Sequence, residues 1–402
     1  MTDEIKIAFV QDALPFQGGA EKVLEAALEA FPSAPIYTLV YREAAFRGSA
    51  IAQHVIHPSF LNRLPGAQTH HRAFLPLMPL AIEQFDLRAY DVIVSFSYAV
   101  AHGVLPRPDQ LHISYVHTPM RYAWQAYHEF NAKHSRLAAP LRWGLRAFLH
   151  SFRKWDFAAA ARVDHFLTVS DWMARCIWRA YRRPADVLYP PADLTAFRPL
   201  APRGEEYVTV SRLVAHKRVD LIVEAFNRLG LRLTVIGEGP ELERLRRLAA
   251  PNVTLLGWQP REKLAEHLGS AKAFIHASEE DFGIAMVEAQ AAGCPVIALN
   301  SGSAREIVQE GHNGVLFNEQ TSQSLAEAVS LFAGGSWSFD ADEIVRSAAR
   351  FDRVRFIDEF TRIVHDDWQL FHQDGTFGSQ KLTLPARFQA RTEHEQVAHD
   401  QF

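Results

Sequence analysis

Short apolar runs recur along most of the chain, and segments with the apolar spacing of amphipathic helices separate them. Buried runs that alternate with helices predict parallel, doubly wound sheets and an α/β fold class. In the first half of the chain the predicted strands are residues 5–10, 36–41, 52–56, 91–96, 112–117, 163–170 and 187–189. In the second half they are residues 207–211, 231–236, 253–256, 273–276 and 296–299.

A break in this pattern divides the chain into two domains. Prolines at positions 190, 191, 199 and 202 interrupt a stretch without regular periodicity. The chain has 402 residues, which is too many for one average domain and enough for two with real cores. The predicted parts are a first domain at 1–190, a linker at 191–204, a second domain at 205–352, a last helix at 353–372 and a disordered polar tail at 373–402.

The composition narrows the class of protein. It is 48% hydrophobic and 22% charged, as in soluble globular proteins, and a formal net charge of -4 argues against a general nucleic-acid binder. The amino terminus has no basic-then-apolar signal, and no uncharged apolar run reaches membrane-spanning length, so we expect a cytoplasmic protein. Cys176 and Cys294 are the only cysteines and lie in different predicted domains, which leaves no disulfide framework or zinc cluster.

Residues 279–298 contain the strongest candidates for a binding or catalytic site. An apolar strand at 272–277 runs into an acidic, glycine-containing turn, and a helix begins near Ile284. The turn would lie at the carboxyl end of a parallel strand, where open α/β sheets bind ligands. The backbone N–H groups of Phe282, Gly283 and Ile284 would open the helix N-terminus, a place that suits anionic or hydroxyl-rich ligands.

Two carboxylates flank this helix start. Glu280 precedes the helix and Glu288 follows about one turn inside it, so both can face one cleft, and Gly283 between them lets a ligand approach the backbone. Taken alone, each has a simpler interpretation, with Glu280 as a helix cap and Glu288 as a solvated helical residue. Together they indicate a binding site.

Two cations follow the first strand of the second domain. Arg212 could grip a diphosphate as a planar fork, and Lys217 could act as a point charge near a helix start. The alternative is that both are solvated surface residues. In the next turns, Trp258 follows a glycine; such turns are common, and Trp258 could be a core aromatic.

The first domain offers weaker candidates. Gly18 and Gly19 form a strand-to-helix turn that could cradle a phosphate or a sugar ring, or could be a plain turn. His117 ends a buried strand, where it is either functional or a structural hydrogen-bonding residue. Residues 70–85 mix prolines with bulky apolar residues, so we expect no single regular helix there and consider them for an acceptor groove.

Residues 133–157 combine arginine and lysine with tryptophan, phenylalanine and leucine. One interpretation is a helix that lies on an anionic membrane surface. The other is a core helix whose arginines cover its solvent face. Pro140 and Gly144 are expected to interrupt the stretch, and the pattern does not decide between the two.

The segment around Glu280 and Glu288 resembles a known family. With Phe-Gly between the glutamates and Glu-Ala-x-Ala-x-Gly-x-Pro-Val-Ile-Ala after them, it is similar to the Glu-x7-Glu signature of retaining glycosyltransferases of family 4. The resemblance extends from about Ile5 to Phe371 and implies the GT-B fold, in which two Rossmann-like domains face each other across a cleft and the last helix crosses back to the first domain. The words VHTPMRYAW and LAIEQFDL look like the branch of bacterial O-antigen and exopolysaccharide mannosyltransferases.

The resemblance implies roles for the candidate residues. It makes His117 and Glu280 the candidate catalytic residues, His117 beside the transferred sugar and Glu280 on the sugar hydroxyls. The turn at Gly18 and Gly19 would face the donor diphosphate and the acceptor.

The same resemblance implies how the second domain would bind the donor. Arg212 and Lys217 would hold the diphosphate together with the helix N-terminus at Gly283, Trp258 would lie against the base, and Glu288 would bind the ribose.

We therefore predict a retaining transferase that moves a hexose, with mannose favoured, from a nucleotide sugar to a polyprenyl-diphosphate-linked glycan in cell-surface polysaccharide synthesis. GDP-mannose is the favoured donor, and no cofactor, metal or nucleic acid is expected. The predicted place is the cytoplasm, with peripheral contact to the inner face of the membrane. A nucleotide-sugar epimerase and a non-catalytic nucleotide-sugar-binding protein remain as alternatives.

Overall fold

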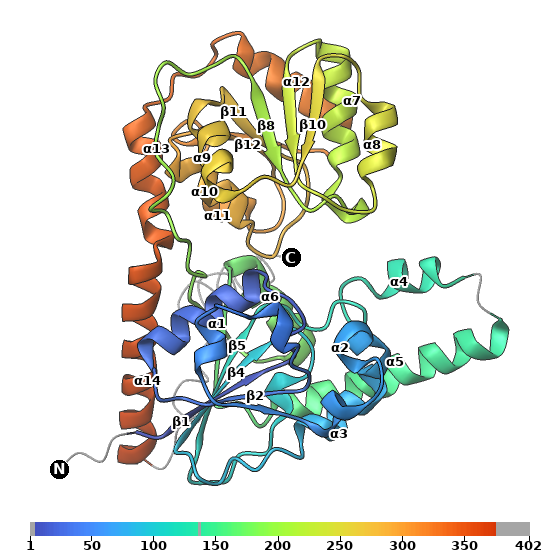
Figure 1. Ribbon diagram of the computed structural model, residues 1–402, viewed down its shortest axis with the longest axis vertical. Coiled ribbons are helices and arrows are strands. Elements are labelled where there is room, and N and C mark those ends of the chain that lie inside the picture. Colours follow the sequence, from blue (N-terminus) through green and yellow to red (C-terminus); the bar gives the residue numbers. More distant parts are fainter. Residues whose placement is uncertain (1–4, 136–137, 375–402) are drawn as a thin grey trace, which may run out of the picture. The chain divides into compact units, whose positions relative to one another are not determined.

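The computed structural model describes residues 5–135 and 138–374, and its contacts divide the chain into two units (Figure 1). The first unit comprises the residues up to Tyr189 together with those from Ile357 on, and the second comprises Pro190–Phe356. Each unit is built on one parallel sheet with helices, which confirms the predicted α/β class with two Rossmann-like units. From residue 375 the predicted disordered tail lies outside the described residues.

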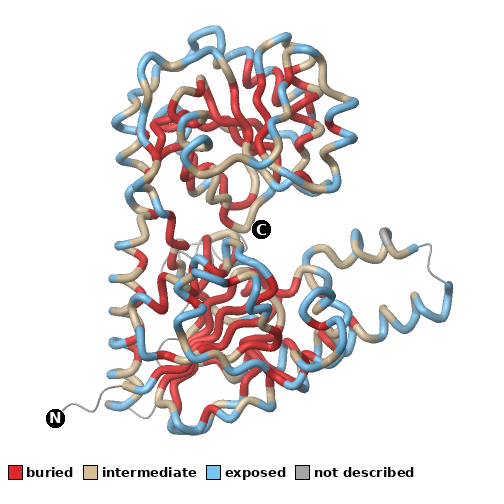
Figure 2. Tube along the Cα trace, viewed as in Figure 1, coloured by how far each residue is buried: buried red, intermediate tan, exposed pale blue. Residues whose placement is uncertain are grey.

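The sheet of the first unit has seven strands in the order β3-β2-β1-β4-β5-β6-β7. These are β1 (Ile7–Gln11), β2 (Ile36–Thr38), β3 (Ile56–Pro58), β4 (Val92–Ser97), β5 (Leu111–Val116), β6 (His165–Thr168) and β7 (Asp186–Val187). The helices are α1 (Gly19–Ala30), α2 (Ala67–His70), α3 (Met78–Ile82), α4 (Tyr127–Lys133), α5 (Ala139–Ala160) and α6 (Asp171–Tyr181). Every residue of the central strands β1, β4 and β5 is buried, because helices cover both faces of a doubly wound sheet (Figure 2).

The sheet of the second unit has six strands in the order β10-β9-β8-β11-β12-β13. These are β8 (Tyr207–Val210), β9 (Leu233–Ile236), β10 (Val253–Gly257), β11 (Ala273–His276), β12 (Val296–Leu299) and β13 (Gly314–Phe317). The helices are α7 (Val219–Leu229), α8 (Leu242–Leu248), α9 (Arg261–Ser270), α10 (Ile284–Ala291), α11 (Ala304–Ile307), α12 (Ser322–Ala333) and α13 (Ala341–Ala348).

The last helix, α14 (Arg353–Asp374), belongs to the first unit from Ile357 onward. Its Phe360 packs against Phe9 and Phe96 of the first sheet, with ring centroids 6.4 and 6.3 Å apart. Asp367 of the same helix binds His165 Nδ1 on β6 at 2.5 Å. The predicted return of the last helix to the first domain is therefore confirmed.

Residues 191–204, predicted as a linker, pack within the second unit. The backbone N–H of Leu200 donates to the carbonyl of Gly269, and the Arg203 guanidinium donates to the carbonyls of Ala271 and Gly293. This stretch forms neither a helix nor a strand and therefore has no regular periodicity. Individual side-chain and main-chain hydrogen bonds hold it in place instead.

Two local predictions were wrong. The strand at residues 52–56 is instead a 3₁₀ helix, Ile51–Gln53, with β3 starting only at Ile56. Pro140 and Gly144 do not interrupt α5, because Pro140 lies in the first turn, where a helix needs no N–H donor, and Gly144 is exposed. None of the helices in the described ranges combines the length and apolar character needed to cross a bilayer.

Candidate functional site

The strand order of the second sheet reverses between β8 and β11. β8 is followed in sequence by β9 on one side, whereas β11 is followed by β12 on the other. Open α/β sheets bind ligands at the carboxyl ends of the strands on either side of such a switch point. The loop after β8 carries Lys217, and the loop after β11 carries Glu280.

Lys217 and Glu280 form an ion pair at this switch point, although they lie 63 residues apart in the sequence. The Lys217 Nζ donates to Glu280 Oε1, which also accepts a hydrogen bond from Ser278 Oγ at 2.8 Å. His276 Nε2 lies 3.6 Å from the same oxygen. The side chains of Lys217 and Glu280 are 23% and 14% exposed, so the pair is partly shielded from water but open to a ligand.

The surroundings set the charges of this cluster. Burial alone would raise the pKa of Glu280, but Lys217 and His276 together hold it below its ordinary value. Burial lowers the pKa of His276 in spite of the nearby carboxylate. At neutral pH Glu280 is therefore ionised and the His276 imidazole is neutral.

Two glycines of the next loop fix the loop that carries Arg212. Gly237 and Gly239 have φ values of +137° and +156°, and a Cβ on them would come within 1.9 Å of the Ser211 carbonyl oxygen and 2.2 Å of the Leu213 carbonyl oxygen. The Leu213 N–H donates to the Glu238 carbonyl at 2.8 Å across this contact. Only glycine allows such close packing of two loops.

Helix α10 begins where the sequence predicted, at Ile284, with Gly283 as its N-cap at φ +90°. A Cβ on Gly283 would lie 2.4 Å from Met286 Cε, the end of a flexible side chain that can move, so it is the positive φ that favours glycine at this position. Phe282 is buried against Phe351, and Ser303 Oγ donates to the Phe282 carbonyl, which fixes the turn. The first N–H groups of any α-helix lack intrahelical acceptors and can bind anions.

The structure decides several alternatives left open by the sequence. Glu280 is not the helix cap, and Glu288 is buried at 8% exposure, so it is not a solvated helical residue. Trp258 is 66% exposed and is not a core aromatic. Arg212 is exposed, and no ion pair of its guanidinium is found within residues 5–135 and 138–374. The roles predicted for these four residues stay predictions.

In the first unit, the glycine turn opens helix α1. Gly18 is the N-cap, Gly19 is the first helical residue, and a Cβ on Gly19 would meet no atom within 4 Å. Glu21 is buried behind the turn, and burial raises its pKa to about 7. The turn therefore leaves open space in front of the backbone, as a ligand would need.

His117 directly follows β5, and its N–H continues the ladder to the Ser97 carbonyl at 2.8 Å. Its ring packs edge-on against Tyr115, and burial lowers its pKa to about 4. In the part of the chain that the structure describes, the buried Nε2 has no hydrogen-bond partner. A neutral imidazole with an unused nitrogen can serve a ligand hydroxyl.

The first sheet also reverses, between β1 and β4, and Asp12 lies at that point. Its carboxylate accepts the backbone N–H groups of Tyr98, Ala99, Val100 and Ala101 at 2.6 to 2.8 Å. Asp12 is 2% exposed, and burial raises its pKa in spite of these donors. The sequence analysis did not single out Asp12; an acidic residue directly after a central strand was the available signal.

A cavity of about 340 Å³ opens beside Asp12 within the first unit. Apolar side chains make most of its wall, and the charged groups are Asp12, Arg72 and Arg121. It is lined by Asp12, Ala13, His71, Arg72, Leu75, Met78, Tyr98, Ala99, Thr118, Met120, Arg121, Tyr122 and Phe130. Residues 70–85 do not form one regular helix, as predicted; they fold as short helical pieces, and four of their side chains line this pocket.

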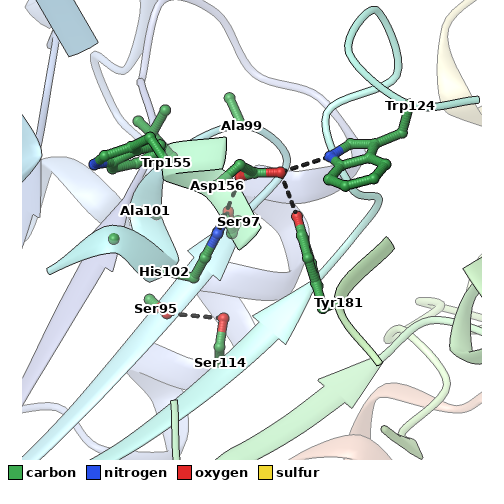
Figure 3. Close-up of polar contacts among 12 residues, drawn as sticks. Ser95, Ser97, Ala99, Ala101, His102, Ser114, Trp124, Trp155, Asp156 and Tyr181 are labelled. Atoms are coloured by element: carbon green, nitrogen blue, oxygen red, sulfur yellow. Dashed lines mark hydrogen bonds and ion pairs between the residues drawn. The ribbon is translucent and has the colours of Figure 1, made fainter. Parts of the chain in front are cut away.

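A buried polar chain lies behind this region (Figure 3). Ser97 Oγ contacts His102 Nδ1 at 3.0 Å, and His102 Nε2 contacts Asp156 Oδ1 at 3.1 Å. Trp124 Nε1 and the Tyr181 hydroxyl both donate to Asp156 Oδ2, at 2.6 and 3.0 Å. The order serine, histidine, aspartate is that of a nucleophilic triad. All three side chains are at most 1% exposed, so they cannot contact a substrate. These hydrogen bonds instead connect α5 to β4.

The structure thus brings Lys217 and Glu280 together, with Phe282, Gly283 and Ile284 opening the adjoining helix in the same unit. Gly18, Gly19 and His117 lie in the first unit. That both groups form one site stays a prediction, as does metal independence. Among the described residues no cluster of three or more His, Cys, Asp and Glu side chains could hold a metal ion.

Comparisons with known proteins agree with this geometry. The family model described as Glycosyltransferase Family 4 matches residues 17–196, and the one described as Glycosyl transferases group 1 matches residues 196–336. The solved structure of a sucrose-phosphate synthase from Thermosynechococcus elongatus superposes with a TM-score of 0.69 at 16% identity, covering 92% of this chain and 100% of that one. At this identity the likeness shows the shared fold alone.

Two curated relatives match parts of the chain. An exopolysaccharide phosphotransferase from Streptomyces coelicolor is 32% identical over 248 residues, 51% of this chain and 26% of the relative. A GDP-mannose-dependent α-(1-6)-phosphatidylinositol monomannoside mannosyltransferase from Mycobacterium tuberculosis is 36% identical over 140 residues, 30% of this chain and 36% of the relative. The chain thus spans about a quarter to a third of these relatives. With the two family models adjoining over residues 17–336, the chain belongs to the family 4 glycosyltransferases.

Proposed function

We propose that this glycosyltransferase moves a hexose, with mannose favoured, from a nucleotide sugar to a lipid-linked oligosaccharide and retains the anomeric configuration. GDP-mannose is the favoured donor and a polyprenyl-diphosphate-linked glycan the favoured acceptor. The reaction would take place in the cytoplasm, at the inner face of the membrane. The relative named as a GDP-mannose-dependent mannosyltransferase supports the donor, and the ion pair of Lys217 with Glu280 at the switch point is the observation that carries the proposal.

In the donor complex, Lys217 would turn from Glu280 toward the diphosphate. Its four-carbon chain allows this movement, and the α10 N-terminus and Arg212 would supply further positive charge. These groups stabilise the negative charge that develops on the leaving nucleoside diphosphate. Glu280, ionised at neutral pH, would then accept hydrogen bonds from sugar hydroxyls, and Glu288 would accept them from the ribose.

The chemical step would run on one face of the sugar. The bond from C1 to the leaving phosphate oxygen breaks, the acceptor oxygen bonds to C1, and the acceptor proton passes to the leaving phosphate oxygen. In this route no carboxylate acts as a covalent nucleophile, and Glu280 would serve to bind the sugar hydroxyls. His117, neutral because of its low pKa, would use its free Nε2 for a sugar hydroxyl rather than as a cation.

The cavity beside Asp12 suits the acceptor. Leu75, Met78 and Phe130 offer apolar walls for an isoprenoid, while Arg72 could pair with a phosphate group. Thr118, directly after His117, also lines the cavity, so an acceptor bound there would lie near the imidazole. Asp12 would repel an anion little, because four N–H groups already share its charge.

Calorimetric titration of the full chain with GDP-, UDP- and ADP-sugars tests the donor. We expect GDP-mannose to bind most tightly. Labelled donor is then incubated with and without a polyprenyl-diphosphate-linked oligosaccharide. Label that moves to the acceptor with retained configuration supports the proposal, whereas an isomerised sugar without acceptor supports an epimerase. Binding with no turnover in either arm supports the non-catalytic alternative, and unchanged turnover in EDTA would support metal independence.

A further inference from the structure

Helix α5 has two chemically different faces. Its inner face is buried in the first unit through Leu149, Phe152 and Asp156, which are at most 2% exposed. Its outer face carries Trp143 at 71% exposure and Phe157 at 49%. Exposed aromatic rings are unusual on the solvent side of a helix that already has a packed inner face.

Basic side chains fill the outer face between these rings. Arg146, His150 and Lys154 are exposed and follow Trp143 at spacings of three and four residues, which places them on one stripe that ends at Phe157. The stripe is about 21 Å long at the rise of an α-helix. Asp156 is the only acidic residue of α5, and it is buried on the opposite face, so nothing on the helix neutralises the stripe.

The surroundings leave this stripe accessible. In Figure 1, α4 and the first half of α5 extend away from the sheet of the first unit. Figure 2 shows this part of α5 mostly exposed. The stripe is a convex ridge on a single helix rather than a groove, so it fits a flat partner better than a peptide.

We propose that the outer face of α5, from Trp143 to Phe157, docks the enzyme on an anionic phospholipid bilayer. Tryptophan and phenylalanine would enter the headgroup region, where amphipathic rings are enriched, and Arg146 and Lys154 would pair with lipid phosphates. A second copy of the chain is a poor occupant, since a two-fold contact through this face would set two basic stripes against each other. The inference extends the proposed function, because a lipid-linked acceptor resides in a bilayer, but its physical basis is α5 alone.

Co-sedimentation with vesicles tests this surface. The full chain is mixed with vesicles of phosphatidylcholine alone or of phosphatidylcholine with phosphatidylglycerol, without nucleotide sugar or acceptor. We expect binding only to the anionic vesicles and weaker binding at high salt. The double variant Trp143→Ser with Phe157→Ser should lower the partition coefficient on the order of tenfold or more. Arg146→Gln with Lys154→Gln should lower it by about 30-fold and remove most of the salt dependence.

Leu331→Ser is the matched control, because Leu331 is 56% exposed on α12 in the second unit and should not affect vesicle binding. All substituted side chains are exposed, so unchanged thermal unfolding should confirm that the variants fold. The proposal is overturned if the natural chain ignores anionic vesicles or if the aromatic variant binds as well as the natural chain. It is also overturned if that variant changes the sedimentation velocity of the free protein, which would make the face a self-association surface. A failure here leaves sugar transfer to a soluble acceptor untouched, and a failure of transfer leaves vesicle binding untouched.

Discussion

The two units carry different charged groups at the point where the strand order of the sheet reverses. Each parallel sheet reverses its strand order once, between β1 and β4 in the first unit and between β8 and β11 in the second. In the first unit, Asp12 at the reversal is bound by four backbone N–H groups of its own chain. In the second, Lys217 and Glu280 bind each other through flexible side chains.

The Asp12 carboxylate therefore has a structural role, whereas the Lys217 ammonium can exchange its partner. If the Asp12 carboxylate moved away, its four N–H donors would be unpaired, which is costly. It therefore fixes the loop that lines the apolar cavity. The Lys217 ammonium can exchange Glu280 for another anion if ligand hydroxyls take its place on the Glu280 carboxylate, because both side chains are flexible and neither is fully buried. From this comparison we predict that the first unit recognises its ligand mainly by shape and the second mainly by charge.

The largest expected effect concerns the exchangeable cation. Lys217→Met removes the charge but keeps most of the chain length, so the developing charge on the leaving diphosphate loses a partner. We expect kcat/KM for sugar transfer to fall by about 10³-fold, in line with the loss of one preorganised electrostatic group in other enzymes. Steady-state kinetics with labelled donor measure the effect.

Lys263→Met is the control for this substitution. Lys263 lies on α9 of the same unit, paired with Glu266, and both side chains are 57% exposed. Its replacement should change transfer and stability little. Near-normal turnover in Lys217→Met would contradict the role of the switch-point cation. The charges at both switch points would then be structural.

The next effect concerns the fixed charge. Asp12→Asn replaces a carboxylate that accepts four N–H groups by an amide with one acceptor oxygen, so about half of the donors would face an NH₂ group. We expect the first unit to lose about 4 kcal/mol of stability, from two or more hydrogen bonds to a charged group. Urea unfolding measures the loss.

Asp109→Asn provides the comparison, because Asp109 is 69% exposed and pairs with Arg107 on the surface of the same unit. It should cost almost nothing. Equal stability of the two variants would show that the Asp12 bonds do not hold the loop in solution.

Local sequence patterns predicted the second unit well. Strands 273–276 and 296–299 and the helix start at Ile284 agree with the structure to the residue, because polar residues or a proline bound both apolar runs and Gly283 precedes the helix. β13 (Gly314–Phe317) was missed, since four residues without flanking periodicity resemble a loop. The strand at 52–56 was wrong for the related reason that a short apolar run also fits a 3₁₀ turn.

Contacts distant in sequence were harder to predict. The pairing of Lys217 with Glu280 depends on β8 lying beside β11, and the bonds of Asp12 to residues 98–101 depend on β1 lying beside β4. Strand order follows from the packing of the whole unit, which no local pattern contains. Placement of candidates at strand ends was predictable, but the partner of each was not.

A smaller effect distinguishes the units by their response to pH. Burial alone would lower the pKa of His165, but Asp186 and Asp367 outweigh it and raise the pKa to about 9. The folded pKa lies above the unfolded value of about 6.5. The stabilisation is therefore complete below pH 6.5 and is lost as the pH rises through 9, with at most about 3 kcal/mol at stake.

Calorimetric unfolding across this range should show the first unit losing stability while the second does not, since the buried His276 of the second unit has a lowered pKa. Addition of a nucleotide identifies the transition of the second unit, because a bound ligand raises it. His165→Gln should remove the alkaline decline. A decline that persists in this variant would mean that His165 does not anchor α14.

The smallest expected effect concerns the edge of the second unit, where we predict that Trp258 binds the base by stacking. Trp258 follows β10 and is 66% exposed. If its ring lies against the nucleotide base, Trp258→Ala should raise the Kd for the nucleoside diphosphate about fivefold, equivalent to about 1 kcal/mol of stacking. Leu256→Ala, two residues earlier and 37% exposed, should leave the Kd unchanged.

Because stacking involves no ions, the loss in Trp258→Ala should be independent of salt, whereas binding through Lys217 should weaken as salt rises. A salt-dependent loss, or an equal loss in both variants, would contradict stacking at this edge.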